Sequence, residues 1–178
     1  QRTGFDAVED LPIYNYQAIG ADFFGGEIET TFHLLESVTA PVDAKSQPAA
    51  TPAQQLDLTF SADYVHAEDR ASEEAVPRIP PFRATAALDY QLGNFGANFE
   101  TQWSACQNRT SDDELPTDSY VLVNAGIDYK LTLGEVNTTF FLKGVNLFDQ
   151  EARQSTSFLK DIVPLAGRGV VVGLRSEF

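Results

Sequence analysis

Residues 56–64 read Leu56-Asp57-Leu58-Thr59-Phe60-Ser61-Ala62-Asp63-Tyr64 and alternate strictly between apolar and polar side chains. Successive side chains of an extended strand point to opposite faces. This stretch therefore predicts a β-strand with one apolar face and one polar face. The apolar set is Leu56, Leu58, Phe60, Ala62 and Tyr64, and the polar set is Asp57, Thr59, Ser61 and Asp63.

The same alternation recurs along the chain and predicts about seven strands in all. The other segments are 27–32, 82–91, 95–105, 121–131, 136–146 and 168–178. Residues 11–26 are expected to extend the first strand, although Asp22 then falls on its apolar face. A β-bulge near Gly25-Gly26, or a position above a membrane, would explain that polar residue.

The connections between these segments differ in length. Gly93-Asn94 and Leu133-Gly134 indicate tight turns, whereas residues 67–80, 107–118 and 147–167 are long and polar. Short turns at one end and long loops at the other are typical of outer-membrane β-barrels. Residues 36–54 are rich in Ala, Pro, Ser and Thr, lie on the short-turn side, and are interpreted as a flexible insertion.

Composition limits the possible classes of protein. The chain of 178 residues has 43% hydrophobic residues, a formal net charge of −14 and no Met, and it begins at Gln1, so we expect a fragment or a processed chain. It lacks an apolar run of about 20 residues, so a membrane-spanning role would require a closed barrel. The acidic balance makes nucleic acid an unsuitable partner, and the single cysteine, Cys106, cannot form an internal disulfide.

A soluble β-sandwich also gives alternating strands and is the alternative fold. The strands are nearer the 9–11 residues of a membrane-spanning strand, which favours the barrel. Seven strands cannot close a bacterial barrel, so the remaining strands are expected from the rest of the protein. Aromatic residues stand at the strand ends, where membrane-interface girdles form: Tyr64, Phe82, Tyr90, Phe95, Trp103, Tyr120 and Tyr129.

An ordered set of motifs closes the sequence. Gly144-Val145-Asn146-Leu147-Phe148-Asp149 is followed by Ser157-Phe158-Leu159-Lys160-Asp161, then Gly167-Arg168, then a strand ending in Phe178. This order resembles the TonB-dependent receptors, in particular a subgroup that includes zinc-uptake receptors. Residues 77–83 are similar to the same group. That subgroup often has His directly before Thr156-Ser157, and this chain has Ser155.

The resemblance implies an all-β, antiparallel transmembrane β-barrel of about 22 strands in the bacterial outer membrane. Residues 1–178 would supply about the last seven strands and begin in an external loop, residues 147–167 would be the last external loop, and Phe178 would be the C-terminal barrel signal. The implied partners are the rest of the barrel, a plug domain, the TonB complex acting through the plug, and membrane lipid. The implied activity is uptake of a metal or metal complex, namely zinc, a ferric siderophore or haem.

Candidate site residues follow from the faces and loops. We expect nine charged side chains to face the lumen and the plug: Glu27, Glu29, Asp57, Asp63, Arg83, Asp89, Glu100, Lys143 and Arg175. Six residues at an external strand end and in the loops are candidate metal ligands: His66, Glu68, Asp69, Asp112, Asp113 and Glu114. For the acidic run 112–114, a solvated loop is the alternative.

The sequence contains no recognisable catalytic constellation and suggests no resident cofactor, because its Ser, His and Asp residues are spread over different strands. An enzyme is therefore not expected. A barrel with a porin-like, structural or adhesive role is the alternative to a receptor, and a plug domain upstream would favour the receptor.

Overall fold

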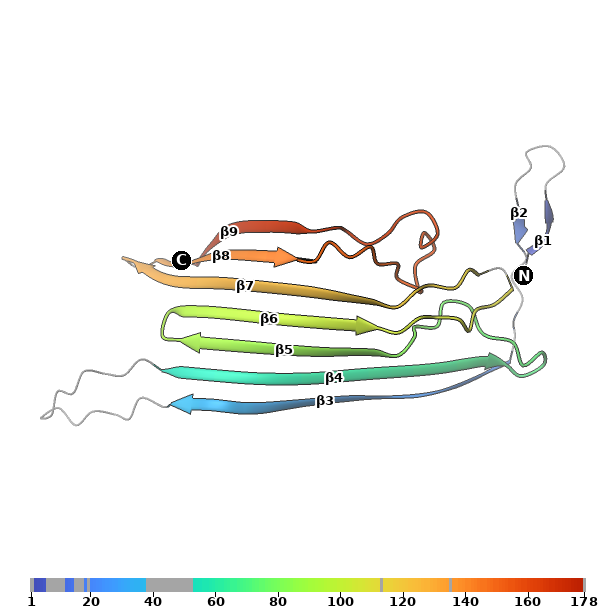
Figure 1. Ribbon diagram of the computed structural model, residues 1–178, viewed down its shortest axis with the longest axis horizontal. Helices are drawn as coiled ribbons and strands as arrows, with labels where there is room; N and C mark the ends of the chain where they lie inside the picture. The colour runs from blue at the N-terminus through green and yellow to red at the C-terminus, as the bar shows by residue number, and fades with distance from the viewer. Residues whose placement is uncertain are drawn as a thin grey trace, which may run out of the picture.

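The computed structural model describes residues 2–5, 12–14, 18, 20–37, 53–112, 114–134 and 136–177. Two short strands, β1 (Arg2–Phe5) and β2 (Pro12–Tyr14), pair with each other. The other seven form one antiparallel sheet in chain order, as Figure 1 shows. No helix among the described residues is long and apolar enough to cross a membrane. The strands of the large sheet are β3 (Ala21–Ser37), β4 (Gln54–Asp69), β5 (Arg83–Leu92), β6 (Phe95–Ser104), β7 (Tyr120–Leu133), β8 (Val136–Val145) and β9 (Gly169–Glu177).

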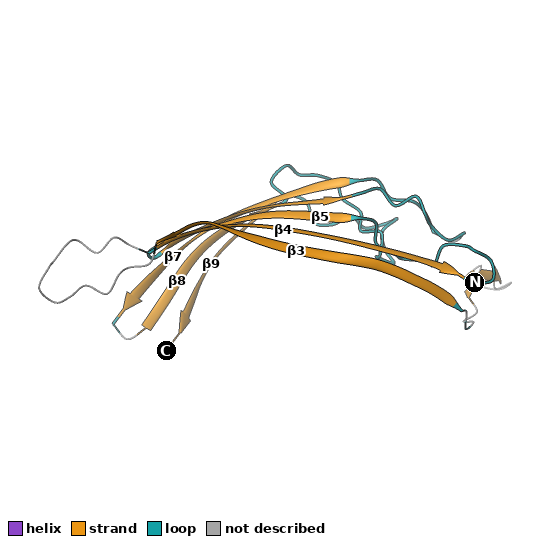
Figure 2. Cartoon of the chain, turned by 90° about the horizontal axis from the view of Figure 1, so that it is seen from below, coloured by secondary structure: helices purple, strands orange, loops and turns teal. Residues whose placement is uncertain are grey.

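The seven-strand prediction is confirmed, and the sheet is a single curved layer (Figure 2). A β-sandwich would pack a second sheet on the apolar side, and the described strands form no such layer. Among the described residues, the buried apolar side chains are only Ala67, Pro81, Val123 and Ala152. The sheet therefore leaves its apolar face open, which is unfavourable in water and favourable in lipid.

The register of strand pairing places apolar residues opposite apolar residues, and polar residues opposite polar ones, in neighbouring strands. Leu58 lies opposite Leu88, and Leu88 lies opposite Phe99, whereas Asp57 lies opposite Asp89. Directly opposed residues point to the same side of a sheet. We call the side of Leu58, Leu88 and Phe99 the apolar face and the side of Asp57 and Asp89 the polar face.

Aromatic side chains form two belts on the apolar face. Tyr64, Phe82 and Trp103 lie at one end, where the Phe82 and Trp103 rings are 5.7 Å apart. Tyr90, Phe95 and Tyr129 lie at the other end. Trp103 and Phe95 are eight residues apart on β6, or about 20 Å in height for a strand tilted by about 40°. The belts thus enclose an apolar band close to bilayer dimensions. Tyr120 differs from expectation, because it lies opposite Ser104 on the polar face.

The two ends of the sheet differ as the sequence predicts. At the turn end, Gly93 and Gly134 adopt positive φ of 55° and 68°, a conformation that glycine tolerates in tight turns. The loop end carries the segments 70–82, 105–119 and 146–168. β3 and β4 are longer than expected and reach Ser37 and Gln54, so the expected insertion at 36–54 is narrower; its residues 38–52, like Phe178, lie outside the described residues.

A bulge near Gly25-Gly26, one of the two explanations for Asp22, is absent, because both residues pair in regular register with Val65 and Tyr64. The irregularity occurs between His33 and Leu35 instead. Its physical effect is to place Leu35 opposite Leu56, on the same face as Phe32.

Adjacent positions on β4 provide a test of the two faces. Leu58→Arg would place a charge on the apolar face, one pair inside the level of Tyr90, at a cost below the about 2–4 kcal/mol of the bilayer midplane. Thr59→Arg would place the same charge on the polar face and should be tolerated. In the full-length protein, we expect Leu58→Arg to reduce the heat-modifiable folded band on gels while Thr59→Arg retains it. Equal behaviour of the two variants would show that the faces are assigned wrongly.

Candidate functional site

The polar face carries all nine residues that the sequence predicts to face inward. Their charges are unevenly distributed. The six carboxylates lie on β3–β6 with Arg83 as their only cation in the set, whereas Lys143 and Arg175 lie on β8 and β9. Asp57 and Asp89 lie directly opposite each other, an arrangement that like charges disfavour. This face therefore suits a charged or hydrated partner and is unsuited to lipid.

Several of these carboxylates have local partners. Arg83 Nη2 lies 2.7 Å from Asp63 Oδ1 across the β4–β5 pair. His33 Nδ1 lies 2.8 Å from Asp57 Oδ1, and Gln55 donates a hydrogen bond of 2.6 Å to the same carboxylate. Asn124 donates to Glu100 at 2.9 Å. These contacts hold charged side chains in place along the wall.

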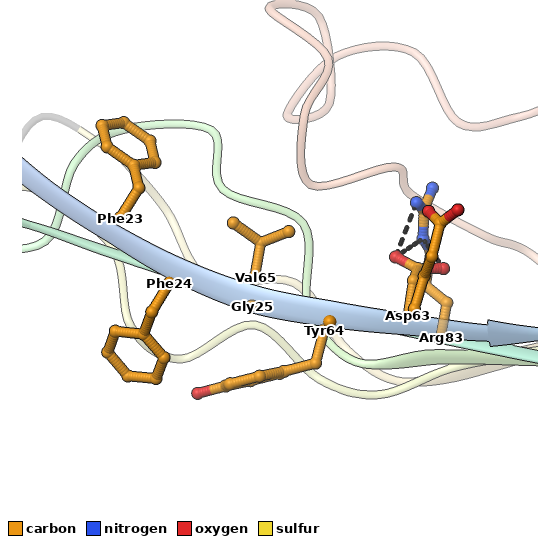
Figure 3. A pocket seen from close by; sticks show the side chains of 9 residues that line it. Phe23, Phe24, Gly25, Asp63, Tyr64, Val65 and Arg83 are labelled. Carbon is orange, nitrogen blue, oxygen red and sulfur yellow. Dashed lines mark hydrogen bonds and ion pairs between the residues drawn. The ribbon is translucent and has the colours of Figure 1, made fainter.

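A cavity of about 560 Å³ lies where β3 and β4 extend beyond β5. Figure 3 shows Phe23, Val65 and the Asp63–Arg83 ion pair on one side of the β3 ribbon and Phe24 with Tyr64 on the other. Gly25 permits the close approach, because a Cβ there would collide with the carbonyl oxygen of Tyr64. On its polar side, this cavity combines the exposed ring of Phe23 with the charged side chains of the polar face.

One carboxylate joins all three segments of the loop end. Glu114 of segment 105–119 lies 2.9 Å from Lys160 Nζ of segment 146–168, and both side chains are buried, at 8% and 4% exposure. The same carboxylate accepts a hydrogen bond of 3.0 Å from the backbone N–H of Arg78 in segment 70–82. The Arg78 guanidinium in turn lies 3.6 Å from the ring centre of Phe158. The three loops are therefore one connected unit.

Asn146 and Asp149 close the base of the last loop. Asn146 is buried, has a positive φ of 47°, and donates through Nδ2 to the Ala166 carbonyl at 3.1 Å. Its backbone N–H donates to Asn124 Oδ1 at 2.9 Å. Asp149 accepts the N–H of Arg168 at 2.8 Å. The motif that carried the family resemblance thus links the beginning of the loop to its end.

The candidate metal ligands are not brought together as one set. His66 Nε2 lies 3.3 Å from Glu68 Oε2, but that carboxylate also lies 3.1 Å from Arg109 Nη2. Asp69 is on the opposite face from His66, and Glu114 holds Lys160. Asp112 is exposed, and Asp113 lies outside the described residues. Within the part of the chain that the structure describes, no three His, Cys, Asp or Glu residues form a metal-binding group.

His66 also belongs to a polar row at the loop end of the apolar face. Its ring stacks on Phe24 with 4.5 Å between centroids. Beyond it, Arg70 Nε donates to Asp22 Oδ1 at 2.6 Å. The hydrogen bond and charge of Asp22 raise the pKa of Arg70. Sequence reasoning missed Arg70 and Arg109, because each contacts a residue distant in the chain, and it noted Arg78 and Lys160 only as parts of motifs.

Comparisons with known proteins agree with this fold. A family model for the β-barrel of TonB-dependent receptor-like proteins matches residues 2–147. A solved structure named Copper transporter OprC aligns with a TM-score of 0.66 and 20% sequence identity, over 85% of this chain and 22% of that one. The chain thus spans about a fifth of the length of that protein. At this identity the likeness concerns the fold.

Glu114 offers a test of the loop unit. Glu114→Gln removes the charge that neutralises buried Lys160, and the loss of one partner of a buried pair typically costs about 3–5 kcal/mol. We expect faster amide hydrogen exchange in residues 157–163 and also around Arg78. Glu151→Gln is the matched control, because Glu151 is 69% exposed in its pair with Arg153 and such pairs contribute about 0–1 kcal/mol. Exchange confined to one loop would contradict the connected unit.

Proposed function

The chain belongs to the TonB-dependent receptor β-barrel family, and on this premise we propose that it forms part of the wall of an outer-membrane receptor that imports a metal or a metal complex. The observation that carries the proposal is the single sheet with an apolar face between two aromatic belts and a charged opposite face. Such a sheet suits a wall between lipid and an aqueous lumen.

The rest of the barrel is supplied by the remainder of the polypeptide. The outer edges of β3 and β9 carry no partner strand among the described residues, and unpaired backbone groups are strongly disfavoured in lipid. Further strands therefore pair with both edges. The loop end is the external side, and the turn end faces the periplasm.

The charged polar face is proposed to contact the plug domain and to keep the wall hydrated. The nine charged residues of the polar face lie on strands whose apolar face contacts lipid. The lipid contact anchors these strands, so the charged side chains keep fixed positions while a plug moves past them. Substrate binds between plug and external loops, and a pull transmitted by the TonB complex opens the path. This mechanism needs no covalent chemistry from the chain.

The substrate is proposed to be a metal or metal complex. The structural neighbour is named a copper transporter, and the last-loop motifs resemble zinc-uptake receptors, so copper and zinc stand beside ferric siderophores and haem. Glu68 and Glu114 already face Arg109 and Lys160. Most metal or carrier contacts are therefore expected from the plug and from loops outside this chain.

A deletion strain tests the function. We expect slower growth and lower cell-associated metal under limitation of one metal when zinc, copper and iron are limited separately. A plasmid copy of the full-length gene should restore both, but only in cells with a working TonB complex. Normal growth and metal content under all three limitations would overturn the proposal and favour a porin-like, structural or adhesive barrel.

A further inference from the structure

A second hollow lies on the apolar face, away from the charged wall. Its volume is about 410 Å³, and it crosses strands β3 to β6. The floor consists of small side chains, chiefly Ala62, Ala84 and Ala86, and larger side chains border it, namely Ile28, Phe60 and Trp103. All six side chains point to the apolar face. The hollow is therefore an apolar groove whose walls carry no charge.

The groove lies at a defined depth. Ala84 is opposite Trp103, a member of the aromatic belt at the loop end, and Ala86 is the next residue of that face toward the middle of the band. Aromatic belts mark the boundary between headgroups and hydrocarbon. The groove consequently begins at this boundary and runs into the zone of the acyl chains.

A charged row lies beyond the belt on the same face. Asp22 and Glu68 are directly opposed, and each meets an arginine, Arg70 and Arg109 respectively. Glu68 is four residues beyond Tyr64 on β4, which is about 13 Å along a strand. At a strand tilt of about 40° this is about 10 Å in height, which places the row at the outer limit of the headgroup layer. The Arg70 side chain is 66% exposed, and one carboxylate cannot use all five N–H donors of a guanidinium.

From the outer-membrane location proposed above, we infer that this groove binds one anionic lipid of the outer leaflet. An acyl chain lies over Ala62, Ala84 and Ala86 between Phe60 and Trp103. The headgroup extends past Tyr64, and a phosphate accepts hydrogen bonds from Arg70 and Arg109. Arginine suits this role because its planar guanidinium matches phosphate geometry. The alternation of small and large residues here thus forms a lipid site within the apolar band.

The groove can be filled without changing the character of the face. In the full-length receptor, Ala84→Leu with Ala86→Leu would occupy the floor. The matched control is Ala97→Leu with Ala125→Leu, since both alanines lie on the apolar face but do not line the groove. Delipidated receptor in detergent is mixed with bisphosphorylated lipid A or with phosphatidylethanolamine, and native mass spectrometry counts the lipids retained.

We expect the wild type and the control to retain one lipid A, and the filled variant to retain at least fivefold less. Arg70→Gln should lower lipid A retention at least threefold and leave phosphatidylethanolamine unchanged. Equal lipid A retention by the filled and control variants would overturn the groove assignment. So would a receptor dimer that is present in the wild type and the control but lost in the filled variant, because the groove would then hold a second receptor copy. Heat-modifiable migration is followed in parallel, because its absence from the wild type would instead count against the barrel on which the inference rests.

Discussion

The structure depends on keeping one register across seven strands. A slip of one residue between two strands would move every apolar side chain of the next strand to the polar face. The pairs Leu58–Leu88 and Leu88–Phe99 show that the phase of alternation is preserved from strand to strand. Because the sheet is a single layer, no packed core corrects an error in register. The two solvents on either side, lipid and water, take the place that a core has in a soluble domain, and they impose the alternation that the sequence displays.

This dependence explains how much the sequence could predict. Period two is a local signal, so the seven strands, both tight turns and the two faces were readable without a structure. The position of the bulge could not be predicted from the sequence, because it depends on which residue of β3 pairs with Leu56 on the other side of the insertion. Phe32 and Leu35 are three residues apart, and only an extra residue between them puts both on the apolar face. A bulge at Gly25-Gly26 is one of two explanations that the parity of Asp22 allows, whereas the observed irregularity between His33 and Leu35 results from pairing.

The candidate site was predictable in part for the same reason. Inward-facing charges such as Asp63 and Arg83 follow from strand parity, so their shared face was foreseen, although the 2.7 Å ion pair between them depends on register. The loop contacts follow no period. The acidic run at 112–114 suggests Glu114 as a metal ligand, but its carboxylate faces Lys160, which is 46 residues away in the chain. The sequence alone does not predict such a pair, since no local pattern around either residue identifies its partner.

Wall and loops are therefore stabilised by different physics, and this bears on function. The wall gains from burying apolar side chains in lipid, a term spread over many residues. The loop end relies on a few specific polar contacts, such as Asn146 with Ala166 and Glu114 with Lys160. Buried polar contacts are costly when incomplete, and because Glu114 contacts the other two loop segments, a change there is expected to affect all three. A receptor built in this way can alter its external surface through few substitutions while its wall stays the same, which is consistent with one barrel family serving different substrates.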